Sequence, residues 1–279
     1  MKQNRNTQKI KTFIIHLARS RERMHQVKYI MENSPFCAEV IDAVDGENLK
    51  EEQIKVYDQK VFTIKPAYPF GLNRGELACF LSHRKAWQEI IDQNLDCALI
   101  LEDDIDFDHC ELKRALEVSR KYIDVFEYIQ FPVREVTDKS NMLASSKDAT
   151  IYKPRVTMLG ACGQLVSRKA AERLLRLTVR IDRPVDTFLQ MHWITNIHLA
   201  AISPKVLTEI SENIGGSTLS KRKPAVEKIG RTFKRFVYRN LVKIYSRKYQ
   251  EDKSSRMIFI LFWIDLMAYF FVDLSKAAS

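Results

Sequence analysis

The sequence lacks several features that mark particular classes of protein. Its 279 residues include five cysteines, an odd number, and no two of them have the spacing of a metal site. This pattern is typical of a reduced, cytosolic chain. The apolar run at residues 12–18 is too short for the core of a signal peptide and has no small-residue cleavage site. We therefore expect the protein to stay inside the cell. We find no internal repeat.

Acidic residues are also scarce relative to basic ones. The chain has 35 acidic and 45 basic residues, a formal net charge of +10, which indicates an acidic partner. Motifs of nucleic-acid-binding folds are missing, and the basic residues concentrate in residues 221–256, so we do not expect nucleic acid as a partner. Anionic lipid and phosphorylated substrates remain as candidate acidic partners. Apolar residues make up 46% of the chain, enough to bury a full core.

Short apolar runs alternate with amphipathic stretches over residues 10–215. The predicted strands lie at residues 12–17, 40–46, 97–101, 128–133, 160–167 and 196–203. The predicted helices lie at residues 19–33, 75–93, 110–120 and 168–178. Residues 50–71 and 136–150 are predicted to be irregular. The alternation predicts an α/β fold with a mostly parallel sheet flanked by helices, in which ligands bind at the carboxyl ends of the strands.

A cluster of carboxylates follows one of these strands, in residues 98–107, ALILEDDIDF. Like charges this close repel one another, so the functional interpretation is a cation, and oxygen ligands suit Mg²⁺ or Mn²⁺. Glu102 and Asp104 are two residues apart and would point the same way from a strand end, whereas Asp103 would point the other way. The alternative is a solvated acidic turn.

A rival enzymatic interpretation uses the same stretch. Asp104 and Asp106 form an Asp-x-Asp pattern after a buried strand, as in metal-dependent phosphohydrolases of the haloacid dehalogenase type. That signature usually stands near the chain start and has Thr two residues past its second Asp, where this chain has Asp108. The phosphohydrolase is therefore only an alternative.

Two neighbouring motifs, GELACFLSHRKAW (75–87) and ALILEDD (98–104), resemble glycosyltransferase family 25. This family includes bacterial lipooligosaccharide galactosyltransferases and collagen glycosyltransferases. Further segments resemble it in the same order: IIHLARSRERM (14–24), AVDG (43–46), GACGQLVSRKAA (160–171) and RPVD (183–186). The resemblance covers roughly residues 10–215, and the whole ordered set is more specific than any one motif. His16 departs from it, because the family commonly has Asn or Ser there.

The resemblance implies a GT-A type, Rossmann-like fold and a nucleotide-sugar donor. A divalent cation, Mn²⁺ or Mg²⁺, would then lie between the carboxylates and the donor diphosphate and stabilise the leaving group. Asp104 is the preferred metal ligand, with Glu102 as the second, directly or through water. Asp103 is a candidate for contact with the donor ribose or sugar hydroxyls.

Other donor-binding candidates come from the first half of the chain. Arg19 and Arg23 follow the first strand and suit phosphate, or they form a solvated helix start. Asp45 and Gly46 are candidates for contact with the uridine, or they form an ordinary turn. Ser82 and His83 lie on the helix before the acidic cluster, where each has a purely structural alternative.

Later residues complete the candidate site. Gly160 and Gly163 would lie beside the donor sugar, or would allow close helix–sheet packing. Asp186 is the candidate catalytic base, because inversion in one step needs a carboxylate to take the proton of the acceptor hydroxyl. Its alternative role is a helix N-cap.

The composition changes after about residue 214, which suggests a catalytic domain at residues 10–215 and a helical region at 216–279. A basic amphipathic helix with an apolar stripe, interrupted by Gly230, indicates an anionic membrane surface or, alternatively, a cap on the domain. Residues 257–274 are almost all apolar, but Asp265 lies among them, so a packed or interfacial helix is preferred to a membrane span.

Together these features predict a cytoplasmic glycosyltransferase, peripheral at the inner face of a bacterial inner membrane. Its reaction would be metal-dependent and inverting, with galactose from UDP-galactose as the first choice of hexose and a lipooligosaccharide or lipopolysaccharide as the lipid-linked acceptor. The alternatives are the phosphohydrolase and a non-catalytic protein that binds membrane surfaces.

Overall fold

The computed structural model describes residues 8–57, 64–137, 141–146, 149–211 and 225–251. The apolar segment at 257–274 and the first part of the predicted helical region, residues 216–224, lie outside the described residues. The proposed domain boundary near residue 215 therefore stays a prediction.

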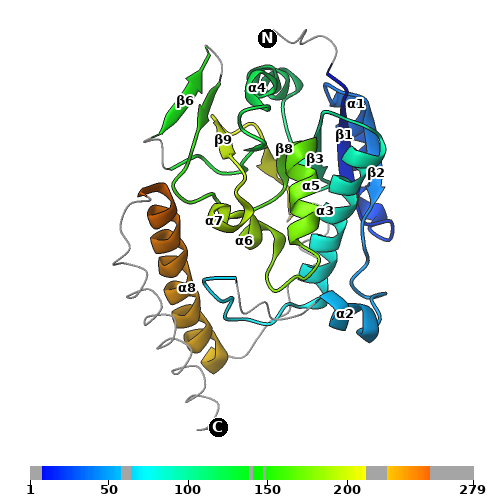
Figure 1. Ribbon diagram of the computed structural model, residues 1–279. Helices are drawn as coiled ribbons and strands as arrows, with labels where there is room; N and C mark the ends of the chain where they lie inside the picture. Colours follow the sequence, from blue (N-terminus) through cyan, green and yellow to red (C-terminus); the bar gives the residue numbers. More distant parts are fainter. Residues whose placement is uncertain (1–7, 58–63, 138–140, 147–148, 212–224, 252–279) are drawn as a thin grey trace.

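The described residues form an α/β fold around one eight-stranded sheet (Figure 1). In spatial order its strands are β2 (Ala38–Asp42), β1 (Ile10–His16), β3 (Cys97–Glu102), β8 (Gly163–Ser167), β5 (Tyr128–Gln130), β9 (Leu199–Ser203), β7 (Thr150–Tyr152) and β6 (Met142–Ser145). β1 is parallel to β2 and β3, and β5 is parallel to β9. β8 is antiparallel to both β3 and β5, and β7 to both β9 and β6. All strands except β8 and β7 therefore point the same way, and the predicted mostly parallel sheet is confirmed.

Helices cover both faces of the sheet. The helices are α1 (Met24–Asn33), preceded by a 3-10 turn at Arg21–Arg23, α2 (Glu51–Tyr57), α3 (Arg74–Asp92), α4 (His109–Tyr122), α5 (Arg168–Leu177), α6 (Val185–Leu189), α7 (His192–Thr195) and α8 (Ala225–Glu251). Helices α3 and α5 pack on one face, and α1 and α4 on the other. A small two-stranded sheet joins β4 (Ile105–Asp106) to β10 (Thr208–Glu209).

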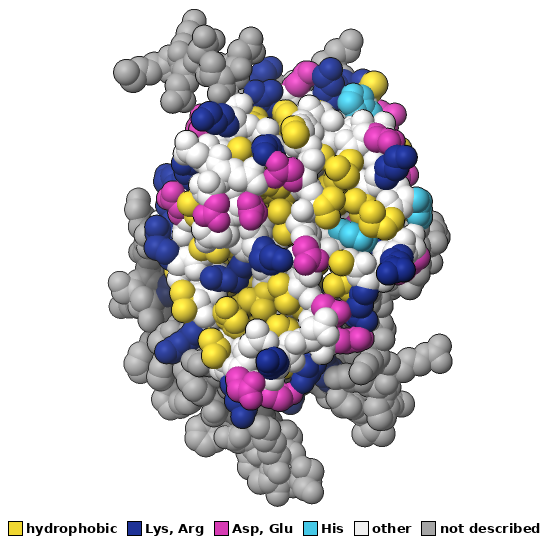
Figure 2. Space-filling view, turned by 90° about the vertical axis from the view of Figure 1, so that its right-hand side faces the viewer, with side chains coloured by type: hydrophobic (Ala, Val, Ile, Leu, Met, Phe, Trp, Pro, Cys, Tyr) yellow, Lys and Arg dark blue, Asp and Glu magenta, His cyan; other side chains and the backbone are white. Residues whose placement is uncertain are grey.

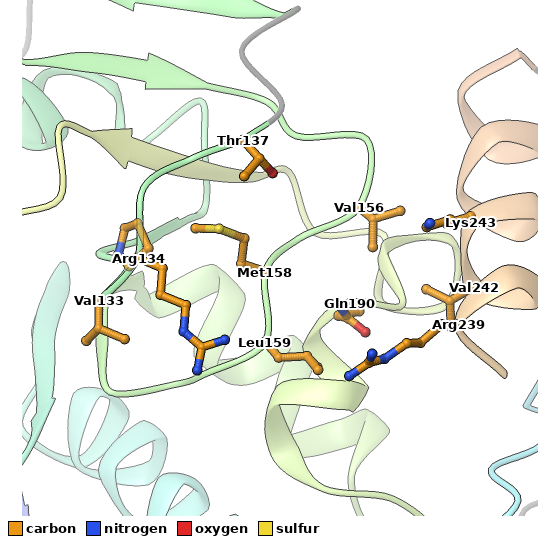
Figure 3. Close-up of a pocket in the computed structure, with 11 residues that line it drawn as sticks. Val133, Arg134, Thr137, Val156, Met158, Leu159, Gln190, Arg239, Val242 and Lys243 are labelled. Carbon is orange, nitrogen blue, oxygen red and sulfur yellow. The ribbon is translucent and has the colours of Figure 1, made fainter. Parts of the chain in front are cut away.

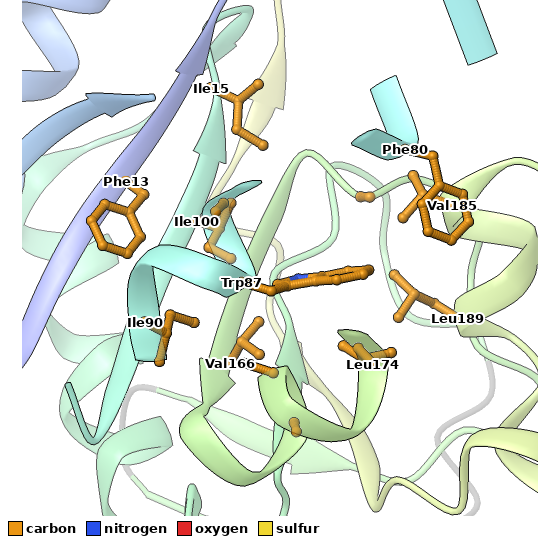
Figure 4. Close-up of a cluster of buried hydrophobic side chains, with 14 of the residues drawn as sticks. Phe13, Ile15, Phe80, Trp87, Ile90, Ile100, Val166, Leu174, Val185 and Leu189 are labelled. Atoms are coloured by element: carbon orange, nitrogen blue, oxygen red, sulfur yellow. The ribbon is translucent and has the colours of Figure 1, made fainter. Parts of the chain in front are cut away.

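The core explains why β3 forms. Its first five residues are fully buried, as expected for a central strand that is covered on both faces. Trp87 of α3 fills the space between the sheet and α5, beside Val166, Leu174 and Leu189 (Figure 4). At the start of α3, Asn73 accepts a hydrogen bond from the Glu76 N–H at 2.8 Å and donates its own N–H to the Glu76 carboxylate at 2.9 Å. This capping box fixes where α3 begins.

Several local predictions were wrong. Residues 50–71 and 136–150 were predicted to be irregular. Helix α2 lies within the first range, β6 lies within the second, and β7 begins at its last residue. These elements are short, so their apolar residues show too few periods for detection. Helix α8 continues through Gly230, because one glycine costs a long helix only about 1 kcal/mol.

Helix α8 packs on the region of α6 and α7 through aromatic and polar contacts. Trp193 stacks on Tyr245 with ring centroids 5.9 Å apart. The fully buried Arg183 donates to the Tyr238 hydroxyl at 3.1 Å and to the Pro66 carbonyl at 3.0 Å. Phe233 is 66% exposed, and Phe236 is 64% exposed. The helix thus caps the domain and also presents an apolar surface.

Candidate active site

The acidic cluster lies at the carboxyl ends of β1 and β3, as predicted for a ligand site in this fold. Glu102 is the last residue of β3, and Asp103 and Asp104 form the turn that leads into β4. The Ile210 N–H donates to the Asp104 carbonyl at 2.8 Å. The turn is therefore held in place from the β10 side.

Asp103 is buried and faces the end of β1. Its carboxylate accepts a hydrogen bond from His16 Nδ1 at 2.7 Å and another from Arg23 Nη1 at 2.7 Å. Because a carboxylate only accepts, His16 Nδ1 carries a proton in this pair. His16 is 5% exposed, and its Nε2 has no hydrogen-bond partner among the described residues. Both carboxylate oxygens of Asp103 are thus engaged by protein groups; its predicted contact with the donor stays a prediction.

Asp104 carries the clearest electrostatic signature of the cluster. Burial, followed by the negative charge of Glu102, raises its pKa from 3.8 to about 7. Its Oδ2 is 3.3 Å from Arg23 Nη1, while Oδ1 is buried without a hydrogen-bond partner among the described residues. Three carboxylates and one guanidinium leave a formal charge of −2 when all are ionised. Carboxylate oxygens are the ligands that Mg²⁺ and Mn²⁺ prefer, and the assignment of Asp104 and Glu102 as metal ligands stays a prediction.

Glu102 also faces a second group of possible ligands. His83 Nε2 donates to Glu102 Oε1 at 3.1 Å, and Gln164 Nε2 donates to His83 Nδ1 at 3.0 Å. Burial opposes ionisation of Glu102, but the hydrogen bonds from His83 and Cys162 and the positive charge of Arg23 keep its pKa below the usual value. Ligand atoms of Cys79, His83 and Glu102 lie within 4.8 Å of one another. This set offers one sulfur, one nitrogen and one oxygen, and its sulfur and nitrogen favour a softer ion, such as Zn²⁺, over Mn²⁺.

Asp186 approaches the same region from α6. Burial and then the charges of Glu102, Asp186 and Asp104 raise the pKa of the Cys79 thiol, so all three carboxylates act on one thiol. Asp186 Oδ2 accepts from the Gly160 N–H at 3.2 Å, and Oδ1 from the Thr187 N–H at 2.6 Å. The N-cap of α6 is Pro184, so the alternative role of Asp186 as N-cap is wrong.

The other predicted donor residues divide into two kinds. Arg19 is half-exposed and forms ion pairs with Asp45 at 3.1 Å and Glu47 at 2.8 Å. Gly46 packs against α3, since a Cβ there would lie 2.9 Å from the Arg74 carbonyl oxygen. Ser82 is buried, accepts from the Val44 N–H and donates to the Ala78 carbonyl, both at 2.8 Å. Gly46 and Ser82 therefore support the loop after β2, while Arg19 and Asp45 lie at its surface.

The two glycines differ in what they permit. Gly160 has a φ of +108°, a conformation that side chains rarely adopt, and it precedes the strand that was predicted to start there; β8 begins at Gly163. A Cβ at Gly163 would lie 2.2 Å from Leu207 Cδ1. Gly163 thus permits close packing, which was the alternative interpretation.

Sequence reasoning missed three neighbours of the cluster: Cys79, Gln164 and Glu209. Cys79 is four residues before His83 on α3, a spacing that places both on one helix face and was a readable signal. Gln164 comes from β8 and Glu209 from β10, and Glu209 contributes to the raised pKa of Asp104. Neither residue belongs to a motif that includes the acidic cluster, and only strand pairing brings each of them near that cluster.

The chain is similar in sequence to procollagen galactosyltransferases. Mouse procollagen galactosyltransferase 2 is 34% identical over 117 residues, which cover 40% of this chain and 18% of that protein. Zebrafish procollagen galactosyltransferase 1 is 29% identical over 192 residues, which cover 63% of this chain and 30% of that protein. The chain thus spans less than a third of the length of these relatives.

A solved structure, mannose-1-phosphate geranyltransferase from Thermus thermophilus, aligns with a TM-score of 0.37 and 11% identity over 70% of this chain and 73% of that one. A model of glycosyltransferase family 25 (LPS biosynthesis protein) matches residues 9–189, a range that contains the acidic cluster, His83 and Asp186. The chain belongs to glycosyltransferase family 25.

Proposed function

We propose that the protein is a metal-dependent, inverting hexosyltransferase that transfers galactose from UDP-galactose to a lipid-linked oligosaccharide. The observation that carries the proposal is Asp104, whose buried Oδ1 lacks a partner among the described residues beside the charged Glu102. Family membership and the galactosyltransferase relatives support the sugar chemistry. They also remove the main support for the phosphohydrolase, as does Asp106, which is exposed and accepts from the Phe107 N–H at 2.9 Å.

In the proposed reaction, Asp186 takes the proton of an acceptor hydroxyl. The oxygen of that hydroxyl attacks the anomeric carbon of the donor sugar as the bond from this carbon to UDP breaks. The hydrogen bonds from Gly160 and Thr187 hold the carboxylate in one orientation. A divalent cation bound by Asp104 and Glu102 would stabilise the negative charge of the leaving diphosphate. His16 Nε2, which has no partner among the described residues, would contact the donor, while Arg23 holds Asp103 and Asp104.

Titration of UDP into the protein by calorimetry tests the donor site. We expect binding in the presence of Mn²⁺, loss of binding with EDTA, and loss in Asp104→Ala. Cys79→Ser serves as the control for the softer ligand set, and it should keep Mn²⁺-dependent binding. If UDP did not bind the wild type under either condition, the nucleotide-sugar proposal would fail.

The proposal places the enzyme at an anionic membrane surface. No helix among the described residues is long and apolar enough to cross a membrane. Residues 230–249 of α8 contain seven Lys or Arg and no Asp or Glu, whereas acidic and basic side chains intermingle on the face in Figure 2. The exposed Phe233 and Phe236 lie among these cations. Cations beside exposed aromatic rings are typical of helices that lie in a membrane interface.

A further inference from the structure

A cavity of about 470 Å³ lies between the domain and α8. Its walls are the segment 132–137 after β5, the segment 156–159, the end of α6 and one face of α8 (Figure 3). This volume is within the usual range for small-molecule sites, roughly 300–1,000 Å³. The cavity is separate from the acidic cluster, because none of the carboxylates discussed above lines it.

Among the described residues, three cations line the cavity and no acidic residue does: Arg134, Arg239 and Lys243. Arg134 and Arg239 extend toward each other from opposite walls, on either side of Leu159 (Figure 3). None of the three forms an ion pair or hydrogen bond with another described residue. Facing guanidinium groups repel, and an anion between them would reverse the sign of that interaction. Their planar donor sets match phosphate and carboxylate in particular.

The walls of the cavity are held by hydrogen bonds in the described structure. Gln130 donates to the Met158 carbonyl at 3.1 Å and to the Gly160 carbonyl at 2.7 Å. Gln190 donates to the Thr157 carbonyl at 2.5 Å, and Ser246 of α8 donates to the Arg155 carbonyl. A site on fixed walls loses less entropy when a ligand binds.

The cavity adjoins the proposed base. Leu159 precedes Gly160, whose N–H donates to the Asp186 carboxylate at 3.2 Å. Gln190 lines the cavity, and its own N–H donates to the Asp186 carbonyl at 3.2 Å. Two walls of the cavity are therefore connected to the proposed base, although the Asp186 side chain does not line the cavity.

We propose that this cavity binds an anionic group, phosphate or carboxylate, carried by the saccharide acceptor. The inference rests on the proposed function and deepens it. Arg134 and Arg239 would clamp the anion from two walls, Lys243 would add charge, and the apolar side chains of Met158 and Leu159 would contact the sugar. The acceptor class would then be a sugar with an anionic substituent, and neutral sugars would be poor acceptors.

Ligand-observed NMR with glucose 6-phosphate and with glucose tests the clamp. We expect wild type to bind the phosphate sugar and not the neutral one, and Arg134→Ala/Arg239→Ala to weaken binding by about tenfold or more. Arg247→Ala is the matched control: Arg247 is an exposed cation on the same helix, as Arg239 is, but it does not line the cavity. Equal weakening in both variants, or equal binding of glucose, would overturn the proposal. Arg239→Lys keeps the charge but not the planar set of donors, so its affinity for glucose 6-phosphate should lie between that of wild type and that of the double variant.

Two further arms separate the sources of the anion. Inorganic phosphate should bind more weakly than glucose 6-phosphate, because it lacks the sugar contacts. Vesicles containing phosphatidylglycerol should bind the double variant and Arg247→Ala alike. If only the double variant lost vesicle binding and its affinity for glucose 6-phosphate were unchanged, the cavity would be a lipid headgroup site and the proposal would be overturned. UDP affinity should be unchanged in every variant, and absent UDP binding in wild type would overturn the proposed function separately.

Discussion

At the scale of single residues, the acidic cluster is best described as three carboxylates with different tasks. Asp103 is paired with His16 and Arg23, Glu102 with His83, and Asp104 retains an oxygen without a partner in the described structure. The sequence predicted the cluster but not this division. The division depends on side chains far away in the chain, such as the 87-residue separation of His16 and Asp103.

The titration of Asp104 should make the metal-free protein less stable as pH rises. Its folded pKa of about 7 exceeds the ordinary value of 3.8, so between these values the folded chain holds a proton that the unfolded chain has released. The associated stability is present below about pH 4 and is lost as pH rises through about 7. The Tm of wild type without metal should fall between about pH 5 and 8 more steeply than that of Asp104→Asn, and Mn²⁺ should restore it at the upper end. Parallel curves for both proteins would contradict this assignment.

Asp186→Asn should abolish most of the transfer while leaving the donor site intact. Loss of a general base typically costs about 10²–10⁴-fold in kcat, and the amide keeps the shape of the side chain. The measurement is UDP-galactose-dependent transfer alongside UDP affinity. Asp124→Asn, at an exposed position before β5, is the matched control and should behave as wild type. Full activity in Asp186→Asn would remove the residue from the mechanism.

At the scale of elements, β8 begins at a glycine because its neighbours leave no space for a Cβ. It lies antiparallel between β3 and β5, and its first residue has no room for a side chain. Gly163→Ala would place Cβ 2.2 Å from Leu207 Cδ1 and 3.2 Å from Phe131 Cβ. We expect a loss of about 1–3 kcal/mol in the free energy of unfolding.

Urea unfolding measures that loss, and Gly71→Ala is the control. A Cβ at Gly71 meets no atom within 4 Å, so its stability should change by less than about 0.5 kcal/mol. Similar values for the two variants would show that Leu207 moves aside freely.

At the scale of the whole molecule, the positive charge is gathered on α8 while the proposed reaction site is acidic. In the proposed membrane-bound state, α8 would hold the domain against an anionic surface. Phe233→Ser/Phe236→Ser should reduce binding to phosphatidylglycerol vesicles without lowering Tm, because both rings are mostly exposed. Vesicle sedimentation at low and high salt measures this; Met142→Ser, at a residue 62% exposed on β6, controls for loss of an exposed apolar side chain. Unchanged sedimentation of the Phe variant would leave α8 as a cap only.

The sequence alone determined the sheet-and-helix order, because long buried runs such as β3 and periodic helices such as α3 carry strong local signals. It also determined the family and the position of the acidic cluster at a strand end. The tertiary structure decided which groups touch or face each other: His16 with Asp103, Gln164 with His83, and Arg134 opposite Arg239. Those arrangements arise from strand order and helix docking, which join residues far apart in the chain. Their energies depend on burial, which no short stretch of sequence contains.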